Sequence, residues 1–437
     1  MKRKLILALG QLAFFVLGKI DYYFTGSNTG IPPEEEVRDP YRVWKILRER
    51  GRIMRSYTNR GWMVLGFEEA QQLFKDPRFS NDTRKNKFLA GAIRAASPDG
   101  RVPFLDQPTL LQMDAPDHTR LRKLVNHGFD HKYILSMEPR IEKIVSKCLD
   151  TYDTETGQYD IVQQLAKPLP AIVIAELLGL PPEDLEHFQD MSNRFLGVTA
   201  IGDDETMREG VIAGDELNAY FKKVVADKKQ HPSQDLIGQL ISAEEEGDRL
   251  TSEELYSTCV LMLIAGHETT TRLISNGIYT LLKHPEQLEK LKRNPALTPN
   301  AVEEMLRYEP PVQLMPRYAL EDMEFYGKKV KKNQLIAPII ASANRDPAAN
   351  TDPDTFDITR KEIKHISFGY GPHLCLGLNL ARLEARVAFN LLFERFPNLT
   401  LADQEIEWTP IPLVRGMENL IVNISEPERD GQPNVNM

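Results

Sequence analysis

The residues best suited to chemistry lie in one short segment, residues 368–377, which reads FGYGPHLCLG. It contains one cysteine and three glycines, and an apolar run with helical periodicity, residues 376–396, follows it. Cys375 therefore lies where a glycine-rich loop enters a helix. Unsatisfied backbone N–H groups at a helix start stabilise a thiolate and can lower its pKa. A thiolate at such a position acts as a nucleophile or as a metal ligand.

Three interpretations of Cys375 are open from the residues alone. A single cysteine is most often a small buried hydrophobic residue, and a cysteine close to His373 can be an activated nucleophile. The third interpretation is axial ligation of haem iron, which the glycines favour because they let the backbone approach a flat, bulky group. Cys148 and Cys259 show neither CxxC nor CxxCH spacing, so nothing indicates a disulfide framework, a zinc site or covalent haem attachment.

A long helix is the element that must be placed against such a cofactor. Thr251 and Glu254 have the spacing of a capping box, and the helix they start extends to Lys283, where His284 and a proline end it. Its sequence is apolar around most of the circumference, which predicts burial. Its middle, residues 265–271, reads AGHETTT, and these residues are poor choices for a buried helix. Such a conflict marks either a functional site or a polar patch that faces solvent.

The two segments together resemble the cytochrome P-450 monooxygenases. The cysteine segment fills every fixed position of that family's haem-binding loop, Phe-Gly-x-Gly-x-His/Arg-x-Cys-x-Gly, and residues 265–269 resemble its oxygen-activating segment, Ala-Gly-x-Asp/Glu-Thr. The resemblance implies that Cys375 is the iron ligand, that Gly266 makes room for O2, and that Glu268 and Thr269 pass protons. It also implies cofactor contacts from further residues of the loop, namely Phe368, Gly369, His373 and Gly377.

Three cationic side chains elsewhere match residues that hold the haem propionates in this family. His118 and Arg122 are four residues apart, so they project from one face of a helix that opens after Pro116. From the residues alone that face is equally a solvated basic surface. By resemblance, His118, Arg122 and Arg317 contact the propionates.

Glu304 and Arg307 match the family's ExxR pair, which alone would be an ordinary helix ion pair. Thr355 departs from the pattern, because it stands where the family usually has an arginine that completes a network with this pair. Threonine cannot bond a carboxylate in a bidentate manner. We expect either that Arg345 or Arg360 substitutes for the missing arginine, or that the network is smaller.

The chain has 437 residues, a formal net charge of −9 and 41% hydrophobic residues. It contains no linker-like composition and no internal repeat, so we expect one large domain over residues 40–425 and a disordered polar tail, residues 427–437. The acidic balance argues against nucleic acid as a partner. The cysteine pattern fits a reducing, cytoplasmic compartment.

Residues 1–20 admit three interpretations. A basic start, Lys2 to Lys4, precedes a mostly apolar run, residues 5–18. As a helix this run would cover ~21 Å, short of the ~30 Å hydrocarbon core of a bilayer. We expect a membrane-surface anchor on the cytoplasmic face of the inner membrane; the alternatives are a helix packed on the domain and a cleaved signal peptide.

The predicted fold is mainly α with a small β-region. Helices are expected over residues 40–50 and 67–75, a strand over 62–66, a hairpin over 323–330 with its turn at Gly327, and a long loop with one short helix over 80–116. The resemblance implies the cytochrome P-450 fold, with haem between the long helix and the helix after Cys375.

The resemblance implies a haem-thiolate monooxygenase, a monomer with haem b that inserts one atom of O2 into a lipophilic small molecule. Electrons from NAD(P)H would arrive through a separate ferredoxin and ferredoxin reductase, because the chain contains no flavin or iron–sulfur domain. The alternatives are an H2O2-dependent peroxygenase and a non-catalytic haem sensor. The candidate pocket segments are mixed apolar: residues 88–111, 195–201, 264, 312–315 and 412–414. The expected ferredoxin-docking cations are Arg120, Arg122, Lys123, Lys361 and Lys364.

Overall fold

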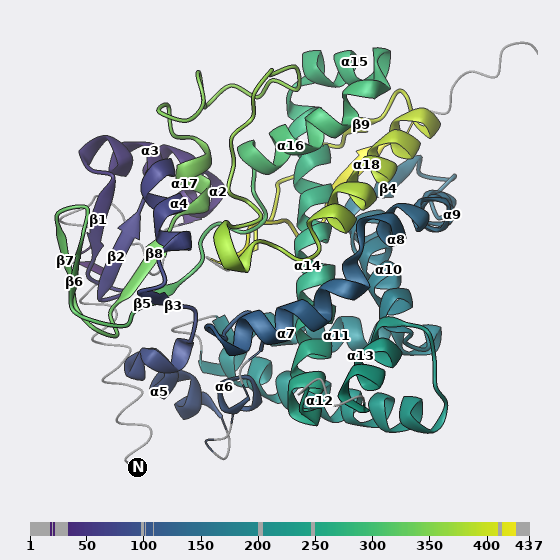
Figure 1. Ribbon diagram of the computed structural model, residues 1–437. Helices are drawn as coiled ribbons and strands as arrows, with labels where there is room; N and C mark the ends of the chain where they lie inside the picture. Colours follow the sequence, from purple (N-terminus) through teal and green to yellow (C-terminus); the bar gives the residue numbers. More distant parts are fainter. Residues whose placement is uncertain are drawn as a thin grey trace, which may run out of the picture.

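A computed structural model describes residues 18, 19, 21, 34–97, 100, 102–107, 109–199, 204–245, 250–409 and 413–424. The anchor predicted over residues 1–20 lies almost entirely outside these residues, and the tail predicted over 427–437 lies wholly outside them. In Figure 1 most of the helices occupy the right and lower parts of the molecule, the largest sheet lies at the left with a few short helices beside it, and one long helix runs vertically through the middle.

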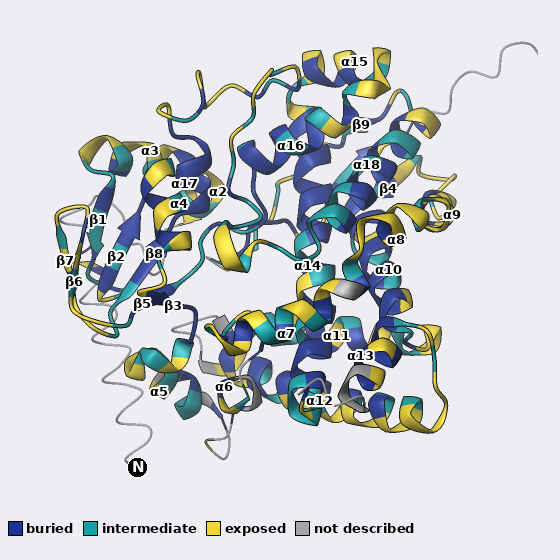
Figure 2. Cartoon of the chain, in the orientation of Figure 1, coloured by how far each residue is buried: buried dark blue, intermediate teal, exposed yellow. Residues whose placement is uncertain are grey.

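That long helix is α14 (Ser252–Lys283), with 32 residues. The predicted capping box is confirmed: the backbone N–H of Glu254 donates to the Thr251 hydroxyl (3.2 Å), and the N–H of Thr251 donates to the Glu254 carboxylate (2.9 Å). The helix ends at His284, as predicted. Most of its side chains are buried, as the dark colouring in Figure 2 shows, because α10 (Pro168–Leu178), α16 (Thr298–Tyr308) and α18 (Leu378–Arg395) pack against it.

The remaining α-helices are short to medium in length, apart from α12. They are α2 (Glu34–Arg38), α3 (Pro40–Arg50), α4 (Phe67–Lys75), α5 (Lys87–Ala96), α6 (Pro103–Asp106), α7 (Asp117–Asn126), α8 (His131–Ser136), α9 (Glu138–Leu149), α11 (Leu185–Leu196), α12 (Asp204–Gln230), α13 (Leu236–Glu245), α15 (Pro285–Arg293) and α17 (Ile340–Asn344). The predicted helices over 40–50 and 67–75 are confirmed as α3 and α4.

The largest sheet has five strands in the order β1-β2-β8-β5-β3. Only β2 and β8 pair in parallel; the other neighbours are antiparallel. A second sheet has the order β4-β10-β9, and β6 pairs with β7 in the predicted hairpin, with Gly327 in its turn at φ +74°. The strands are β1 (Ile53–Ser56), β2 (Gly61–Val64), β3 (Phe79–Ser80), β4 (Gln158–Asp160), β5 (Arg317–Ala319), β6 (Met323–Phe325), β7 (Lys328–Val330), β8 (Leu335–Pro338), β9 (Thr400–Leu401) and β10 (Ile421–Asn423).

Two local predictions need correction. The strand predicted over 62–66 is present as β2, but its partner β1 was not predicted. The stretch predicted as a loop with one short helix, residues 80–116, contains the ten-residue α5 and the short α6. Asn86 starts α5, because its side chain accepts a hydrogen bond from the N–H of Leu89 (3.1 Å). The many charges around α5 obscured its apolar side in the sequence.

Among the described residues, one helical stretch, 161–178, has the length and apolar composition of a membrane span. It joins a π-helical segment (Ile161–Ala166) to α10, and 67% of it is buried inside the molecule. A core helix of a water-soluble protein shows this pattern, and α10 packs on α14 and α9.

The network predicted around Glu304 is complete although Thr355 lacks a guanidinium. Arg307 donates two hydrogen bonds of 2.7 Å to the Glu304 carboxylate, and both side chains are fully buried. Arg360 Nε donates to the same carboxylate at 3.0 Å, which confirms that Arg360 substitutes for the missing arginine. Arg345 instead donates to the carbonyl of Tyr308. The backbone carbonyl of Thr355 accepts from Arg307 (3.0 Å), so this position takes part through its main chain.

Candidate active site

The cysteine loop has the backbone shape that its glycines predict. Gly369 and Gly371 have φ of +72° and +74°, values that side chains other than glycine rarely adopt. A Cβ at Gly371 would lie 2.9 Å from the carbonyl oxygen of Phe74, at the end of α4. The N–H of Cys375 donates to the carbonyl of Phe368 at 2.8 Å, which closes the loop just before α18. A Cβ at Gly377 would meet nothing within 4 Å, so this side of the loop is open to a bulky partner.

The helix start does not by itself lower the pKa of Cys375 in the protein alone. Burial raises the pKa of the thiol, and this effect outweighs three opposing ones: the N–H of Gly377 and the guanidiniums of Arg122 and Arg382. The helix start thus favours the thiolate without securing it. A coordinated metal ion would deprotonate the thiol outright.

Arg122 connects the loop to α7. Its guanidinium donates to the backbone carbonyl of Leu374, one residue before Cys375. By resemblance Arg122 was expected to contact a haem propionate. The bond to Leu374 leaves that role open, because a guanidinium has further N–H donors. Arg122 therefore braces the loop whether or not it also meets the cofactor.

A second brace, which was not predicted from the sequence, joins the loop to α16 and α18. Arg382 donates to both carboxylate oxygens of Glu303 (2.6 and 2.8 Å), and its guanidinium lies 4.6 Å from the ring centre of Phe368. The ring of His365 contacts the same carboxylate at 3.0 Å. Burial tends to raise the pKa of Glu303, but the hydrogen bonds from Arg382 and His365 win and bring it to about 2.

Cationic and imidazole groups without anionic partners gather beside the loop. The ring of His118, from α7, stacks on that of His373 with centres 3.8 Å apart, and His118 Nε2 is buried with no hydrogen-bond partner among the described residues. Burial, together with His118, Arg317 and Arg122, lowers the pKa of His373 to about 3. Both rings are thus neutral near pH 7.

Arg317, on β5, is 4% exposed and forms no ion pair within the described part of the chain. Its guanidinium donates to the carbonyl of Pro316 (2.9 Å) and lies 4.8 Å from the ring centre of Phe74. Burial lowers the pKa of Arg317 to about 10. A buried guanidinium without a carboxylate is costly, so this position suits an anionic group of a ligand.

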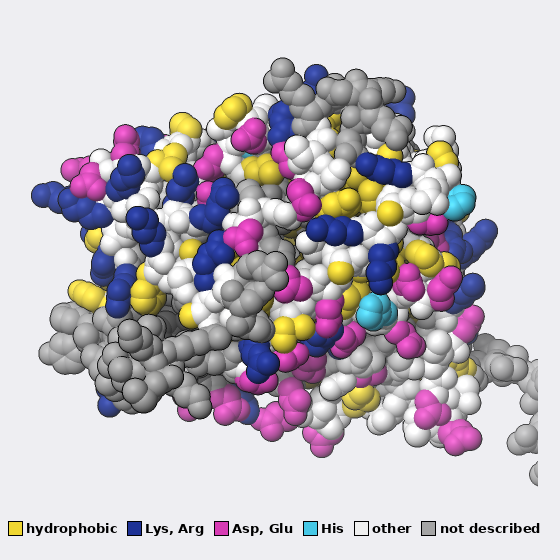
Figure 3. All heavy atoms as spheres, turned by 90° about the horizontal axis from the view of Figure 1, so that it is seen from below, with side chains coloured by type: hydrophobic (Ala, Val, Ile, Leu, Met, Phe, Trp, Pro, Cys, Tyr) yellow, Lys and Arg dark blue, Asp and Glu magenta, His cyan; other side chains and the backbone are white. Residues whose placement is uncertain are grey.

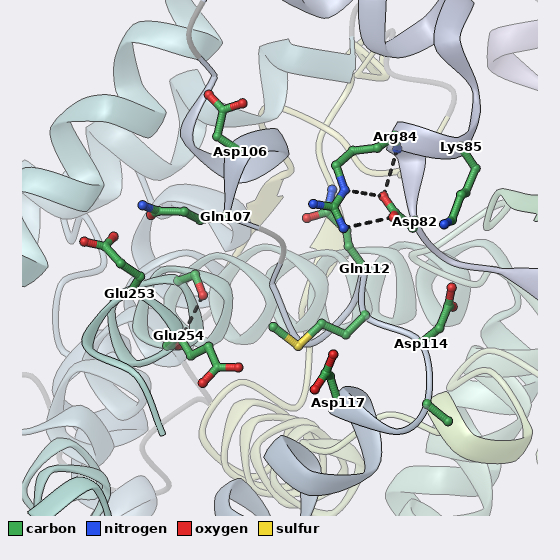
Figure 4. A pocket seen from close by; sticks show the side chains of 13 residues that line it. Asp82, Arg84, Lys85, Asp106, Gln107, Gln112, Asp114, Asp117, Glu253 and Glu254 are labelled. Carbon is green, nitrogen blue, oxygen red and sulfur yellow. Dashed lines mark hydrogen bonds and ion pairs between the residues drawn. The ribbon is translucent and has the colours of Figure 1, made fainter. Parts of the chain in front are cut away.

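Two residues that line the pocket in Figure 4, Asp114 and Glu254, also hold the start of α7 in place. The volume of the pocket is about 460 Å³, and carboxylates from the starts of α7 and α14 line it. Asp114 accepts hydrogen bonds from the Ser80 hydroxyl and the N–H of Asn81 (3.1 Å), and Arg120 donates to Glu254. These bonds tie the start of α7 to β3 and to α14. Arg120 is consequently occupied and contributes little to a docking surface.

The middle of α14 remains accessible although the rest of the helix is buried. Ala265 is exposed, and Gly266 and Thr269 are partly exposed. Because Ala265 and Thr269 are four residues apart, they share one face of the helix. The Thr269 hydroxyl donates to the carbonyl of Ala265 at 2.7 Å. A Cβ at Gly266 would lie 3.0 Å from Ile174 of α10, so the absence of a side chain keeps the two helices close.

The side chains of Glu268 and Thr269 are not brought together. Glu268 is buried, and its carboxylate accepts from Arg272 Nη2 at 3.2 Å and lies 3.6 Å from Nδ1 of His267. Arg272 Nη1 in turn donates to the Thr409 hydroxyl at 2.9 Å. Adjacent residues point about 100° apart on a helix, which accounts for the separation. The i, i+4 spacing of Glu268 and Arg272 was a signal for this pair in the sequence.

The cytochrome P450 family model matches residues 81–422. The chain belongs to the cytochrome P450 family. It is 38% identical over 396 residues to the biotin biosynthesis cytochrome P450 of Bacillus subtilis (strain 168), an alignment that covers 89% of this chain and 97% of the relative. P450s are haem enzymes that use O2, and relatives of this chain are named monooxygenases and hydroxylases, so this P450 is an oxidoreductase of that class.

Two solved P450 structures share the fold closely. P450BioI, in complex with acyl carrier protein ligated with hexadec-9Z-enoic acid, has a TM-score of 0.82 and 38% identity, and the match covers 90% of this chain and 100% of that one. The myxobacterial CYP267B1, in complex with myristic acid, has a TM-score of 0.83 and 36% identity, with 90% and 98% covered. The predicted P450 fold is confirmed.

The described residues fit haem. A thiol on an open glycine loop suits the iron, the lone buried guanidinium of Arg317 and the unpaired Nε2 of His118 suit propionates, and the accessible middle of α14 suits the opposite face of a flat group. The chemistry of the donors and their placement agree with one another.

The low pKa of Glu303 gives a pH prediction. Its folded-state pKa, about 2, lies below the ordinary value, 4.5, so its contribution to stability is complete above about pH 5 and is lost as the pH falls toward 2. Glu303→Gln should therefore lower the free energy of unfolding by on the order of 2–3 kcal/mol at pH 7, and by progressively less below pH 4.5. Urea unfolding from pH 7 to pH 3 measures the difference.

Glu286→Gln, at an exposed position on α15, is the matched control and should show no such pH dependence. A Glu303→Gln deficit that stays constant down to pH 3 would mean that the carboxylate is not held ionised by Arg382 and His365.

Proposed function

We propose that this P450 holds haem b through Cys375 and inserts one atom of O2 into a lipophilic small molecule, with electrons from a separate ferredoxin and ferredoxin reductase. The observation that carries the proposal is the position of Cys375 on an open glycine loop, beside buried cationic and imidazole groups that have no anionic partner among the described residues. When bound, haem supplies the reductive activation of O2 and the insertion of oxygen.

The chain's own residues hold and orient the cofactor. Gly377 and the turn at Gly369 let the loop backbone approach a flat surface, and Phe368, fixed by Arg382, keeps the loop in shape. The propionates would accept hydrogen bonds from Arg317 and His118, and from the remaining donors of Arg122. The neutral ring of His373 supports His118 by stacking.

Thr269 and Glu268 have separate roles in the proposed proton delivery. The Thr269 hydroxyl lies on the accessible face of α14, where, after releasing the carbonyl of Ala265, it would hydrogen-bond toward O2 bound on that face. Glu268 must rotate away from Arg272 to reach that hydroxyl. Arg272 is therefore a positioning residue that keeps the Glu268 carboxylate turned away from Thr269.

The first prediction concerns Cys375. Cys375→Ser should lose the red-shifted Soret band that a thiolate–haem adduct gives after reduction and addition of CO, because an alcohol does not replace the thiolate donor. Absorption spectra of the purified proteins test this. Cys148→Ala, a buried cysteine on α9, should keep the band. A normal band in Cys375→Ser would refute the assignment.

The second prediction concerns coupling. Thr269→Ala should still bind substrate, but most of the NAD(P)H consumed should yield peroxide instead of product, since the hydroxyl that delivers the proton is gone. Product and peroxide per NAD(P)H are measured together. Thr271→Ala is the matched control, because Thr271 also donates to the carbonyl four residues earlier (3.0 Å) but is buried. Full coupling in Thr269→Ala would exclude the role.

The lipophilic substrate class rests on the sequence and on the relatives. The structure of the homologous P450BioI contains a fatty acyl chain on acyl carrier protein, and that of CYP267B1 contains myristic acid. In this chain Val312 and Val414 pair across a β-bridge, in segments predicted to line the pocket. Phe88, the first residue of another of these segments, is 54% exposed. Fatty acids and their carrier-linked forms are the first ligands to screen by the spin-state shift of the haem.

Ferredoxin docking is proposed on the surface around the cysteine loop. Leu374, Leu135 and Tyr133 are exposed there, and Lys123 of α7 is exposed beside them. Lys364 lies 3.2 Å from Glu362, so its charge is partly compensated. Ferredoxins are typically acidic, and a local basic patch steers encounter although the whole chain is acidic.

The third prediction follows from this patch. Lys123→Glu should slow the first electron transfer from ferredoxin, with a larger effect at low ionic strength, where charges are less screened. Stopped-flow reduction at several salt concentrations measures it, with haem content as a check. Lys143→Glu, on α9, is the control and should reduce at the normal rate. If Lys123→Glu retains both the rate and its salt dependence, the docking surface lies elsewhere.

We also propose a cytoplasmic monomer whose residues 1–20 attach it peripherally to a membrane. The three cysteines are free, as a reducing compartment requires. The apolar run of residues 5–18 is too short to span a bilayer but long enough to lie in its surface.

A further inference from the structure

We propose that one end of this P450 lies flat on an anionic membrane surface, through a patch formed by Arg60, Lys87, Phe88 and Lys332. The patch combines the β1–β2 turn, the start of α5 and the β7–β8 turn, at the lower left of Figure 1. The inference deepens the proposed membrane attachment and rests on it. It adds a second, folded contact to the one made by residues 1–20.

The first observation is where the N-terminal segment joins the folded domain. Asp21 is fully buried, and its carboxylate accepts hydrogen bonds from the N–H groups of Tyr57 and Thr58 (2.9 Å for Thr58) and from the hydroxyl of Ser56 (3.4 Å). A carboxylate that accepts several backbone bonds is a firm attachment. Asp21, which follows the basic and apolar residues 1–20 in the sequence, is therefore fixed to the β1–β2 turn.

The second observation is an aromatic side chain directed outward at this turn. Phe88 is 54% exposed, more than any other large hydrophobic residue in the described part of the chain. The guanidinium of Arg60 lies over its ring, 4.4 Å from the centre. Arg60 has φ +49°, a left-handed conformation that costs energy for an arginine. At a membrane surface, the Arg60 guanidinium would contact the lipid headgroups and the Phe88 ring would reach the boundary with the acyl chains.

The third observation is the local charge. Arg60, Lys87 and Lys332 are exposed and form no salt bridge among the described residues. The β7–β8 turn is fixed beside Arg60, because Gln334 Nε2 donates to its carbonyl at 3.0 Å. Most of the nearby acidic residues face cations: Asp322 pairs with Lys331 (2.9 Å) and accepts from the backbone N–H of Lys332 (2.8 Å), and Glu324 is opposite Lys329 in the hairpin. Glu321 is exposed and forms no salt bridge among the described residues.

The patch therefore carries an excess of positive charge on an acidic protein. Figure 3 shows the molecule from below, where Lys and Arg are frequent on the left, the side of the β-region, and Asp and Glu are frequent along the lower edge. An anionic bilayer attracts such cations, whereas the acidic part of the face would be repelled.

A membrane is the occupant that accounts for all three observations. A single short apolar segment gives only weak, reversible binding, and stable attachment takes a second signal such as a basic patch. Here the second signal lies beside the tether. An acidic protein would explain the cations, but it would not explain why they surround the attachment point of an apolar segment.

The test is flotation of the full-length holoprotein with phosphatidylcholine vesicles, with and without phosphatidylglycerol. We expect stronger binding to the anionic vesicles. Arg60→Glu/Lys332→Glu should reduce that binding by at least about tenfold, since each cation near the surface contributes on the order of a fivefold change. Phe88→Ser should reduce binding to both kinds of vesicle.

The matched control is Lys143→Glu/Lys147→Glu on α9, which changes the net charge equally, at the opposite side of Figure 1. It should bind like the unmodified protein. The inference is overturned if the two double variants bind equally, or if anionic lipid gives no advantage. It also fails if the full-length protein binds neither vesicle.

The spectrum of the reduced CO complex separates this result from the proposed catalytic function. All of these variants should keep the thiolate band, because none of the substituted residues is near Cys375. A failed Cys375 assignment would leave the vesicle results standing, and negative vesicle results would leave the Cys375 assignment intact.

Discussion

A buried carboxylate, Glu304, fixes the segment that delivers the cysteine loop. It accepts two bonds from Arg307, one from Arg360 and one from the N–H of Asp357 (2.9 Å), and the side chains of Glu304 and Arg307 are fully buried. Charges removed from water are tolerated only when their hydrogen-bonding capacity is filled, and removing one partner commonly costs ~3–5 kcal/mol. Glu304 therefore helps to fix the conformation of residues 353–360, the segment that leads into the cysteine loop.

From that anchor, the site is assembled by braces that approach the loop from different elements. Arg122 comes from α7, Arg382 from α18, and the main chain of α4 packs against Gly371. Each brace ends on the loop backbone or on Phe368, so none blocks the open side of Gly377. The positive charge that these braces bring is an asset here, because it favours both a thiolate and carboxylate groups of a ligand.

The sequence predicted what depends on local spacing. The capping box of α14, the end of that helix at His284 and the turn at Gly327 follow from rules that span a few residues. The sequence did not predict partners that meet only after folding, such as Arg382 with Glu303 or Asp21 with the β1–β2 turn. Thr355 illustrates both cases. The sequence offered Arg345 and Arg360 as substitutes for the missing arginine, but only the structure shows that Arg360 takes this role.

The Cys375 thiol shows a different limit of sequence reasoning. A helix start lowers a thiol pKa when the site is wet, but the extent of burial cannot be read from residue types, and burial reverses the sign in the protein alone. Similarly, adjacency of Glu268 and Thr269 in the sequence suggested a shared task, whereas helix geometry sends their side chains to different surroundings.

The contact between Arg272 and Gly416 has a consequence for how this chain can evolve. A Cβ at position 416 would lie 2.5 Å from a nitrogen of Arg272, so the arginine fits only beside a glycine. A side chain at position 416 would therefore force Arg272 to move away from Glu268 and Thr409, unless position 272 has first become smaller. The two sites, far apart in the chain, are constrained to change in a fixed order, and the side chain that holds Glu268 is inherited together with the glycine that accommodates it.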